Sequence, residues 1–159
     1  MEYVTTEGVD IPALGFGTWP LKGATCRTAV QNALETGYRH IDTAQMYSNE
    51  DAVGQAIVDS EVPREDVFLV TKIHRQNLSH DKVLSSVEQS VQRLGTEIDL
   101  LLIHAPSRSV PIEESISAMN ELQTRGLVAH IGVSNFSVKQ MRRAIETSET
   151  PILTNQVAY

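Results

Sequence analysis

Short apolar segments alternate with helical patterns along most of the chain. The six apolar segments are LGFGT (14–18), HID (40–42), VFLVTK (67–72), IDLLLIHA (98–105), VAHIGVSNF (128–136) and ILTNQV (152–157). The residues between them predict helices at 25–36, 50–60, 80–94 and 111–125, with a last helix after Ser137. Ahead of all these, residues 2–13 alternate weakly around Glu7-Gly8, which predicts a short hairpin.

The predicted helices carry local start and stop signals. In the helix at 80–94 five apolar residues share one face, and Gly95 follows as a stop. These residues are Val83, Leu84, Val87, Val91 and Leu94. Pro111 suits the first turn of the fourth helix, and Ser137-x-x-Gln140 forms a capping box for the fifth.

The apolar segments predict a parallel sheet in an α/β fold. Runs such as Phe68 to Val70 and Leu100 to Ile103 are continuously apolar, so both of their faces are covered, and helical crossovers join them. Two architectures compete, an open doubly wound sheet and a (β/α)8 barrel. The first predicts a G-x-G-x-x-G turn, but Pro20 follows Gly15 and Gly17 where the third glycine belongs.

Polar or glycine-containing groups at every strand end favour the barrel, because a barrel brings all carboxyl ends around one mouth. These groups are Gly17-Thr18, Asp42, Lys72, His104, Ser134-Asn135 and Asn155-Gln156. A doubly wound sheet would concentrate them at one switch point. The sequence therefore predicts an incomplete barrel of about six parallel strands and five helices, in a single domain over residues 1–159.

Composition narrows the function classes. The 159 residues carry a formal net charge of −7, with a sequence pI near 5.2, so nucleic acid is not an expected partner. There is no signal-peptide pattern and no apolar run near 18 residues, so we expect no membrane partner and a cytoplasmic location. The lone Cys26 has no partner at metal-ligand spacing, so no metal site is expected.

Six motifs make the chain resemble the aldo-keto reductase family. They are LGFGTW (14–19), YRHIDTAQMYSNE (38–50), VTK (70–72), LLIH (101–104), IGVSNF (131–136) and NQVAY (155–159), in family order and at family-like spacing. The resemblance covers the whole chain but only six of the eight strands of the family's barrel. It implies reduction of aldehydes and ketones, or the reverse oxidation of alcohols, with NADP(H) as cofactor and NAD(H) as the alternative.

The resemblance also implies roles for particular residues. The catalytic four would be Asp42, Tyr47, Lys72 and His104. The residues matching the family's cofactor site are Thr18 and Trp19 beside the nicotinamide ribose and the substrate, Asp42, which is also one of the catalytic four, and Ser134, Asn135 and Gln156 on the carboxamide. Taken singly, Asp42 and Asn135 also suit a helix cap, Lys72 a solvated loop and His104 a satisfied core position.

The four residues together suit carbonyl reduction. A proton donor must reach the oxygen on which negative charge develops, and Tyr47 could supply the proton. We expect the ammonium of Lys72 to lower the phenol pKa from about 10, and Asp42 to compensate that buried charge. A neutral His104 would donate to the same oxygen and orient the substrate.

The chain departs from the family pattern at two positions, and it spans only part of the family's fold. Both facts leave alternative functions open. Ala105 stands where the family often has a bulky aromatic residue, which questions substrate specificity, and Ala158 stands in place of a Glu. The family's pyrophosphate clamp lies in its last β/α units, so we expect the isolated chain to be inactive. Its open sheet edges would favour self-association or a complementary fragment. The alternatives are a non-catalytic NADP-sensing or interaction subunit and an open-sheet ligand-binding domain.

Overall fold

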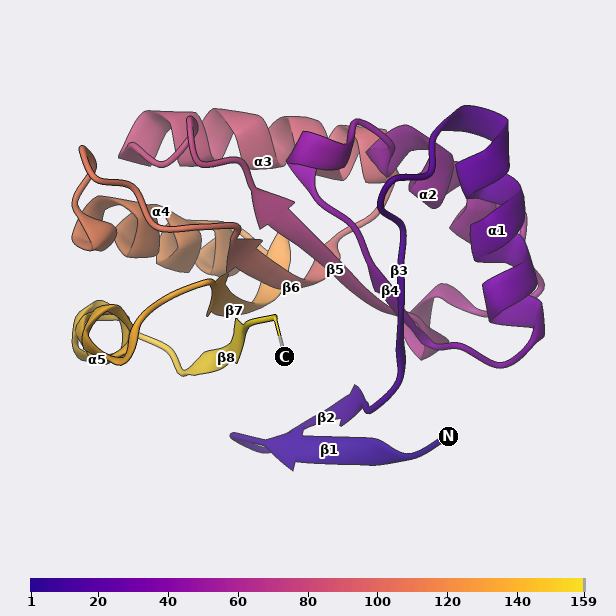
Figure 1. The fold of residues 1–159 in the computed structure, drawn as a ribbon, viewed down its shortest axis with the longest axis horizontal. Coiled ribbons are helices and arrows are strands. Elements are labelled where there is room, and N and C mark those ends of the chain that lie inside the picture. Colours follow the sequence, from indigo (N-terminus) through magenta and orange to yellow (C-terminus); the bar gives the residue numbers. More distant parts are fainter. Residues whose placement is uncertain (159) are drawn as a thin grey trace.

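Six parallel strands in chain order form the sheet in the part of the chain that the structure describes, residues 1–158 of a computed structural model. They are β3 (Gly15–Gly17), β4 (His40–Asp42), β5 (Phe68–Ile73), β6 (Ile98–Ile103), β7 (Val128–Ser134) and β8 (Ile152–Gln156). The order never reverses, so the sheet has no switch point and curves as a half-barrel rather than a doubly wound sheet (Figure 1). The barrel prediction is confirmed.

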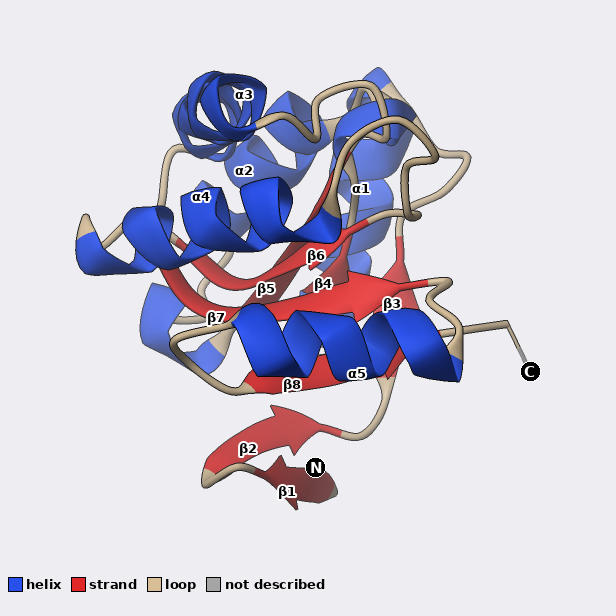
Figure 2. Ribbon diagram, turned by 90° about the vertical axis from the view of Figure 1, so that its left-hand side faces the viewer, coloured by secondary structure: helices blue, strands red, loops and turns tan. Residues whose placement is uncertain are grey.

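Five α-helices connect these strands within residues 1–158 and cover one face of the sheet (Figure 2). They are α1 (Gly23–Glu35), α2 (Glu50–Val58), α3 (His80–Leu94), α4 (Ile112–Thr124) and α5 (Val138–Thr147). Two short 3-10 turns accompany them, η1 (Gln45–Tyr47) and η2 (Arg64–Asp66). Ser137 and Gln140 make the predicted capping box, and Gly95 ends α3 in the left-handed conformation.

The two faces of each strand have different surroundings, because side chains alternate along a strand. On β5, Leu69 and Ile73 join the large core beneath the helices. Val70, between them in sequence, belongs instead to a small cluster on the inner face with Leu100 and Leu102. Both faces are therefore apolar along most of the strand length, as the continuous apolar runs predict.

The predicted hairpin is present and lies where β3 begins, apart from the helices (Figure 1). It consists of β1 (Tyr3–Thr6) and β2 (Val9–Pro12), and both turn residues have positive φ, 49° at Glu7 and 78° at Gly8. Positive φ at both central residues is the geometry of the tightest hairpin turns. Val9 and Ile11 of the hairpin pack against the inner cluster of the sheet.

The sheet has two edges within the described residues, since β3 and β8 each pair with one neighbour only. On α5, which packs next to β8, Val138 and Ile145 are 72% and 53% exposed. No helix among residues 1–158 is long and apolar enough to cross a membrane. Tyr159, the last residue of the NQVAY motif, lies outside the described residues.

Candidate active site

Because side chains alternate along a strand, two charged residues of the inner face meet at the carboxyl ends of neighbouring strands. Lys72 comes two residues after Val70 on β5, and Asp42 ends β4 beside it. Lys72 is 2% exposed, and its Nζ donates to Asp42 Oδ1 at 2.5 Å and to the Thr43 carbonyl at 3.1 Å. An ammonium so deeply buried needs this counter-charge, as the sequence analysis expected of Asp42.

Tyr47 reaches the same place from η1, the turn that follows β4. Lys72 Nζ lies 5.4 Å from the centroid of the tyrosine ring. The ring also packs edge to face against His104, which follows β6, with 5.8 Å between centroids. All four residues predicted to be catalytic therefore lie in one cluster, although they come from three strand ends and a loop.

The site's electrostatics follow mainly from burial. Loss of hydration, and then the Lys72 charge, lower the pKa of His104, so its imidazole is neutral at pH 7. Burial lowers the pKa of Lys72 against the opposing effect of Asp42. The Nδ1 atom of His104 is buried and has no hydrogen-bond partner among residues 1–158. His40 Nε2, at the opposite end of the sheet, is a second buried atom without a partner, so this feature alone does not mark the site.

The pKa of Tyr47 moves in the direction opposite to the one expected. Burial raises it above its ordinary value, and the Asp42 carboxylate adds to that rise. The expectation that Lys72 lowers this pKa is wrong for this arrangement, because Lys72 is paired with Asp42 and part of the ring is desolvated. Tyr47 therefore keeps its proton throughout the neutral range.

The residues predicted to lie beside the nicotinamide ribose differ in exposure. Thr18 is fully buried at the end of β3, where its N–H donates to the Asp42 carbonyl at 3.0 Å. Trp19 is 67% exposed. Thr18 thus joins β3 to the strand end that carries Asp42, whereas the indole of Trp19 is accessible to a ligand.

The three predicted carboxamide-binding residues form a second group, linked to the first. Gln156 at the end of β8 donates from Nε2 to Asp42 Oδ2 at 2.9 Å, across 114 positions of sequence. Ser134 Oγ donates to the Gln156 carbonyl at 2.9 Å, and Asn135 Nδ2 donates to the His104 carbonyl at 2.9 Å. Asn135 has a φ of 59° and does not cap α5, whose cap is Ser137.

Residues 13–159 match the model of the Aldo/keto reductase family. The chain belongs to this family. It is 46% identical over 153 residues to the methylglyoxal reductase DkgB of Salmonella typhi, a match that covers 94% of this chain and 57% of that protein. The chain thus spans little more than half the length of this aldo-keto reductase relative.

Solved structures agree with this assignment. The thermostable aldo-keto reductase Tm1743, in complex with the inhibitor epalrestat, is 40% identical and superposes with a TM-score of 0.94 over 100% of this chain and 63% of that one. Bombyx mori aldo-keto reductase AKR2E4, in complex with NADP, is 32% identical with a TM-score of 0.90, over 99% and 58%. The half-barrel is therefore the fold of the corresponding part of an aldo-keto reductase.

Sequence reasoning assigned no role to two buried polar residues that follow the tyrosine in this aldo-keto reductase chain. Asn49 is fully buried, accepts a hydrogen bond from Thr43 Oγ1 at 2.6 Å and donates to the Leu21 carbonyl at 2.9 Å. Glu50 is 1% exposed and accepts a hydrogen bond from Thr71 Oγ1 at 2.6 Å. Their position inside the YSNE motif was visible in the sequence, but their burial was not.

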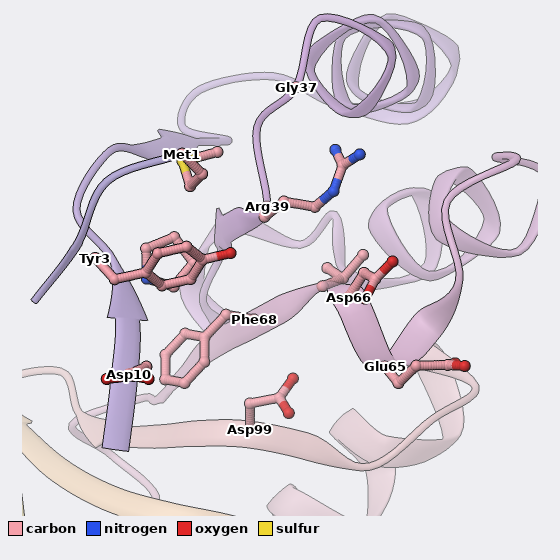
Figure 3. Close-up of a pocket in the computed structure, with 11 residues that line it drawn as sticks. Met1, Tyr3, Asp10, Gly37, Arg39, Glu65, Asp66, Phe68 and Asp99 are labelled. Atoms are coloured by element: carbon pink, nitrogen blue, oxygen red, sulfur yellow. The ribbon is translucent and has the colours of Figure 1, made fainter. Parts of the chain in front are cut away.

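A pocket at the opposite end of the sheet is separate from this site. It lies between the hairpin and the start of β5 and β6, and Figure 3 shows Asp10, Arg39, Glu65, Asp66 and Asp99 around it. Within residues 1–158, no three His, Cys, Asp or Glu side chains are grouped so that they could hold a metal ion. The charged residues of this pocket therefore form no recognisable metal site.

Proposed function

We propose that the protein carrying this chain reduces aldehydes and ketones to alcohols with NADPH, and that Tyr47 donates the proton. The observation that supports this best is the convergence of Tyr47, Asp42, Lys72 and His104 at the carboxyl ends of the sheet, in a chain of the aldo-keto reductase family. Active sites of parallel barrels lie at this end. Because the chain spans 57% of its relative, the whole protein's activity is part of the proposal.

The donor set at the ends of β7 and β8 fits a nicotinamide. Side-chain amides of Asn135 and Gln156 offer both donors and acceptors, the complement of a carboxamide, and Ser134 adds a hydroxyl. Gln156 is exposed, so its amide is accessible. These three residues would hold the carboxamide, with Thr18 and Trp19 beside the ribose; the bound cofactor would supply the hydride. NAD(H) stays the alternative to NADP(H).

The chain's own residues would act on the carbonyl oxygen. The Tyr47 hydroxyl donates its proton as negative charge develops there, and its raised pKa keeps that proton in place at neutral pH. His104, neutral because its pKa is lowered, donates a hydrogen bond and orients the carbonyl. Lys72 places a positive charge beside the tyrosine, while Asp42 holds that ammonium in position.

The substrates we propose are small carbonyl compounds, in line with the methylglyoxal reductase relative. Ala105, directly after His104, leaves more room than the bulky aromatic residue common in the family. We therefore propose that the pocket accepts bulkier carbonyl compounds than related enzymes do. The predicted cytoplasmic location stays a prediction.

The test is Tyr47→Phe in a chain that also carries the later β/α units of the family, with NADPH oxidation as the readout. We expect carbonyl reduction to fall by about two to four orders of magnitude while NADPH binding is nearly unchanged. Tyr38→Phe is the matched control, because Tyr38 packs on Phe16 away from the site. Equal rates for Tyr47→Phe and the parent would remove Tyr47 from the mechanism.

The same experiment separates the non-catalytic alternative. A parent protein that binds NADPH tightly and reduces no carbonyl compound would favour the NADP-sensing or interaction subunit.

We also propose that the chain of 159 residues by itself associates through its open edges, with another copy or with a complementary fragment. The unpaired backbone of β3 and β8 and the exposed apolar face of α5 support this. Size-exclusion chromatography would decide it, since a well-behaved monomer contradicts the proposal.

A further inference from the structure

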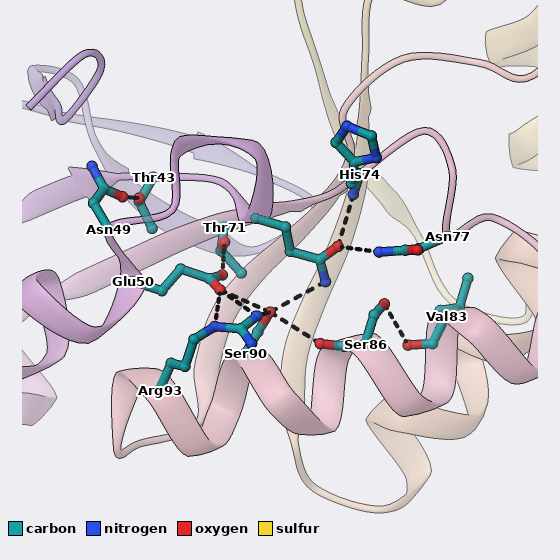
Figure 4. Close-up of polar contacts among 11 residues, drawn as sticks. Thr43, Asn49, Glu50, Thr71, His74, Asn77, Val83, Ser86, Ser90 and Arg93 are labelled. Carbon is teal, nitrogen blue, oxygen red and sulfur yellow. Dashed lines mark hydrogen bonds and ion pairs between the residues drawn. The ribbon is translucent and has the colours of Figure 1, made fainter. Parts of the chain in front are cut away.

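Two polar side chains flank Tyr47 along the chain and belong to one partly buried hydrogen-bond network. Gln45 begins η1, the turn that ends with Tyr47, and Glu50 begins α2 three residues later. The loop between them contains Ser48, which has a φ of 52°. Figure 4 shows the contacts of this region, which join the loop after β4 to β5 and to α3.

Gln45 uses both ends of its amide. Its Oε1 accepts from the backbone N–H of His74 at 2.9 Å and from Asn77 Nδ2 at 3.1 Å. Its Nε2 donates to Ser90 Oγ at 3.2 Å. The turn that carries Tyr47 is thereby attached to the loop after β5 and to the C-terminal part of α3, where Ser90 lies 45 residues away in sequence.

Ser90 links Gln45 to Glu50 through hydrogen bonds to both side chains. Its hydroxyl is fully buried and donates to Glu50 Oε2 at 3.1 Å, while it accepts from Gln45 and, at 3.2 Å, from Arg93 Nη2. The Ser86 carbonyl oxygen, 3.2 Å from Ser90 Oγ, is the alternative acceptor for the same proton. One donor and two acceptor positions are all that a hydroxyl has, so Ser90 is saturated.

Glu50 completes the network on the far side of the tyrosine. Its Oε2 accepts from Arg93 Nε at 2.9 Å and from Arg93 Nη2 at 2.8 Å, and its Oε1 accepts from Thr71 Oγ1. Thr71 precedes Lys72 on β5. The carboxylate therefore links the start of α2 to the strand that carries the lysine of the site.

The side chain of Tyr47 is not held by a hydrogen bond of its own, since its hydroxyl makes none within the protein among residues 1–158. Its ring lies 5.4 Å from Lys72 Nζ and 5.8 Å from the ring of His104, measured from its centroid. The η1 turn that carries the ring therefore helps to set where the hydroxyl lies. We propose that Gln45, acting through Ser90 and Glu50, is a positioning residue for Tyr47. The effect of Gln45 on catalysis rests on the proposed function, in which Tyr47 is the proton donor.

The first readout needs no activity. The protein is labelled with 3-fluorotyrosine, and the Tyr47 fluorine signal is assigned by its loss in Tyr47→Phe. We expect Gln45→Met and Ser90→Ala to shift or broaden the Tyr47 signal, because each removes a hydrogen bond that holds the turn. The chemical shift of the Tyr38 signal should not change, because Tyr38 lies before β4, at the opposite end of the sheet. Gln89→Met is the matched control, since Gln89 is exposed on α3 next to Ser90.

Two results would overturn the inference. One is a Tyr47 signal that does not move in Gln45→Met or Ser90→Ala. The other is a joint movement of the Tyr47 and Tyr38 signals, which would mean that the network supports the whole fold rather than the tyrosine. These outcomes do not depend on whether the protein reduces carbonyl compounds.

The second readout is kinetic and applies once reduction is established. We expect Gln45→Met to lower kcat by about ten- to a hundredfold with far less change in KM, because a misplaced donor affects the reacting geometry more than substrate binding. A change confined to KM would contradict a positioning role. A parent protein without reductase activity would contradict the proposed function. The fluorine signals would still show whether Gln45 and Ser90 position Tyr47.

Discussion

An ion pair, partly or almost fully buried, lies at each end of the same sheet. The two pairs differ in how many of the hydrogen-bonding groups around them are used by the fold. At the amino end, Arg64 and Asp99 are 2.8 Å apart, with side chains 22% and 27% exposed. Arg64 also donates to Thr96 Oγ1 and to the carbonyls of Val67 and Glu97. Most of its hydrogen-bonding capacity thus serves to join η2 to the start of β6.

At the carboxyl end the pair of Lys72 and Asp42 is more deeply buried, at 2% and 14%. Beside it, the Tyr47 hydroxyl makes no hydrogen bond within residues 1–158, and the Tyr47 ring packs against His104. An unpaired buried nitrogen does not separate the two ends, because His40 Nε2 at the start of β4 is unpaired as well as His104 Nδ1. A deeply buried cation next to a phenol that the fold does not use distinguishes the candidate active site from a structural clamp.

The largest expected effect comes from removing the cation at each end in turn. Lys72→Met should lower kcat for carbonyl reduction by about two orders of magnitude or more, because the proton donor loses its charged neighbour. Arg64→Met should leave kcat of the folded protein unchanged and lower the free energy of unfolding by about 2–4 kcal/mol, the sum of several lost hydrogen bonds. NADPH oxidation and urea unfolding measure the two effects. Similar kinetic losses in both variants would erase the distinction between the ends.

We expect an effect of intermediate size on substrate preference when a tryptophan is introduced at either end of the sheet. Ala105→Trp should raise kcat/KM for small aldehydes relative to branched or aromatic ketones by about tenfold, because it narrows the pocket beside His104. Leu14→Trp is the matched control, since Leu14 is 60% exposed before β3 at the amino end. An unchanged ratio in Ala105→Trp would mean that another segment lines the substrate pocket.

The smallest expected effect is a pH dependence of stability. The folded state lowers the pKa of His104 below its ordinary value of about 6.5, so the unfolded chain binds more protons there as the pH falls. Stability should therefore decrease as the pH drops through and below about 6.5. His104→Gln should weaken this loss when Tm is compared at pH 7 and pH 5.5. Identical pH dependences in parent and variant would assign the loss to other groups.

Local patterns were sufficient for most of the secondary structure, whereas the catalytic candidates came from motifs shared with the aldo-keto reductase family. Apolar runs and helix signals depend on neighbouring residues, so the strands, the capping box at Ser137 and the hairpin turn at Glu7-Gly8 were readable in order. The limits of the apolar runs also placed Asp42 and Lys72 at strand ends, but only the structure showed that both lie on the inner face. The choice between barrel and open sheet could be made from those ends alone.

Only packing between distant segments decided the rest. The contact of Gln156 with Asp42, the network from Gln45 to Glu50 and the close approach of α2 to α3 at Gly54, where any Cβ would strike the Leu94 backbone, all join residues far apart in the chain. The raised pKa of Tyr47 has the same origin. Desolvation and charge pairing depend on which groups surround a side chain in three dimensions, and no local pattern records those neighbours.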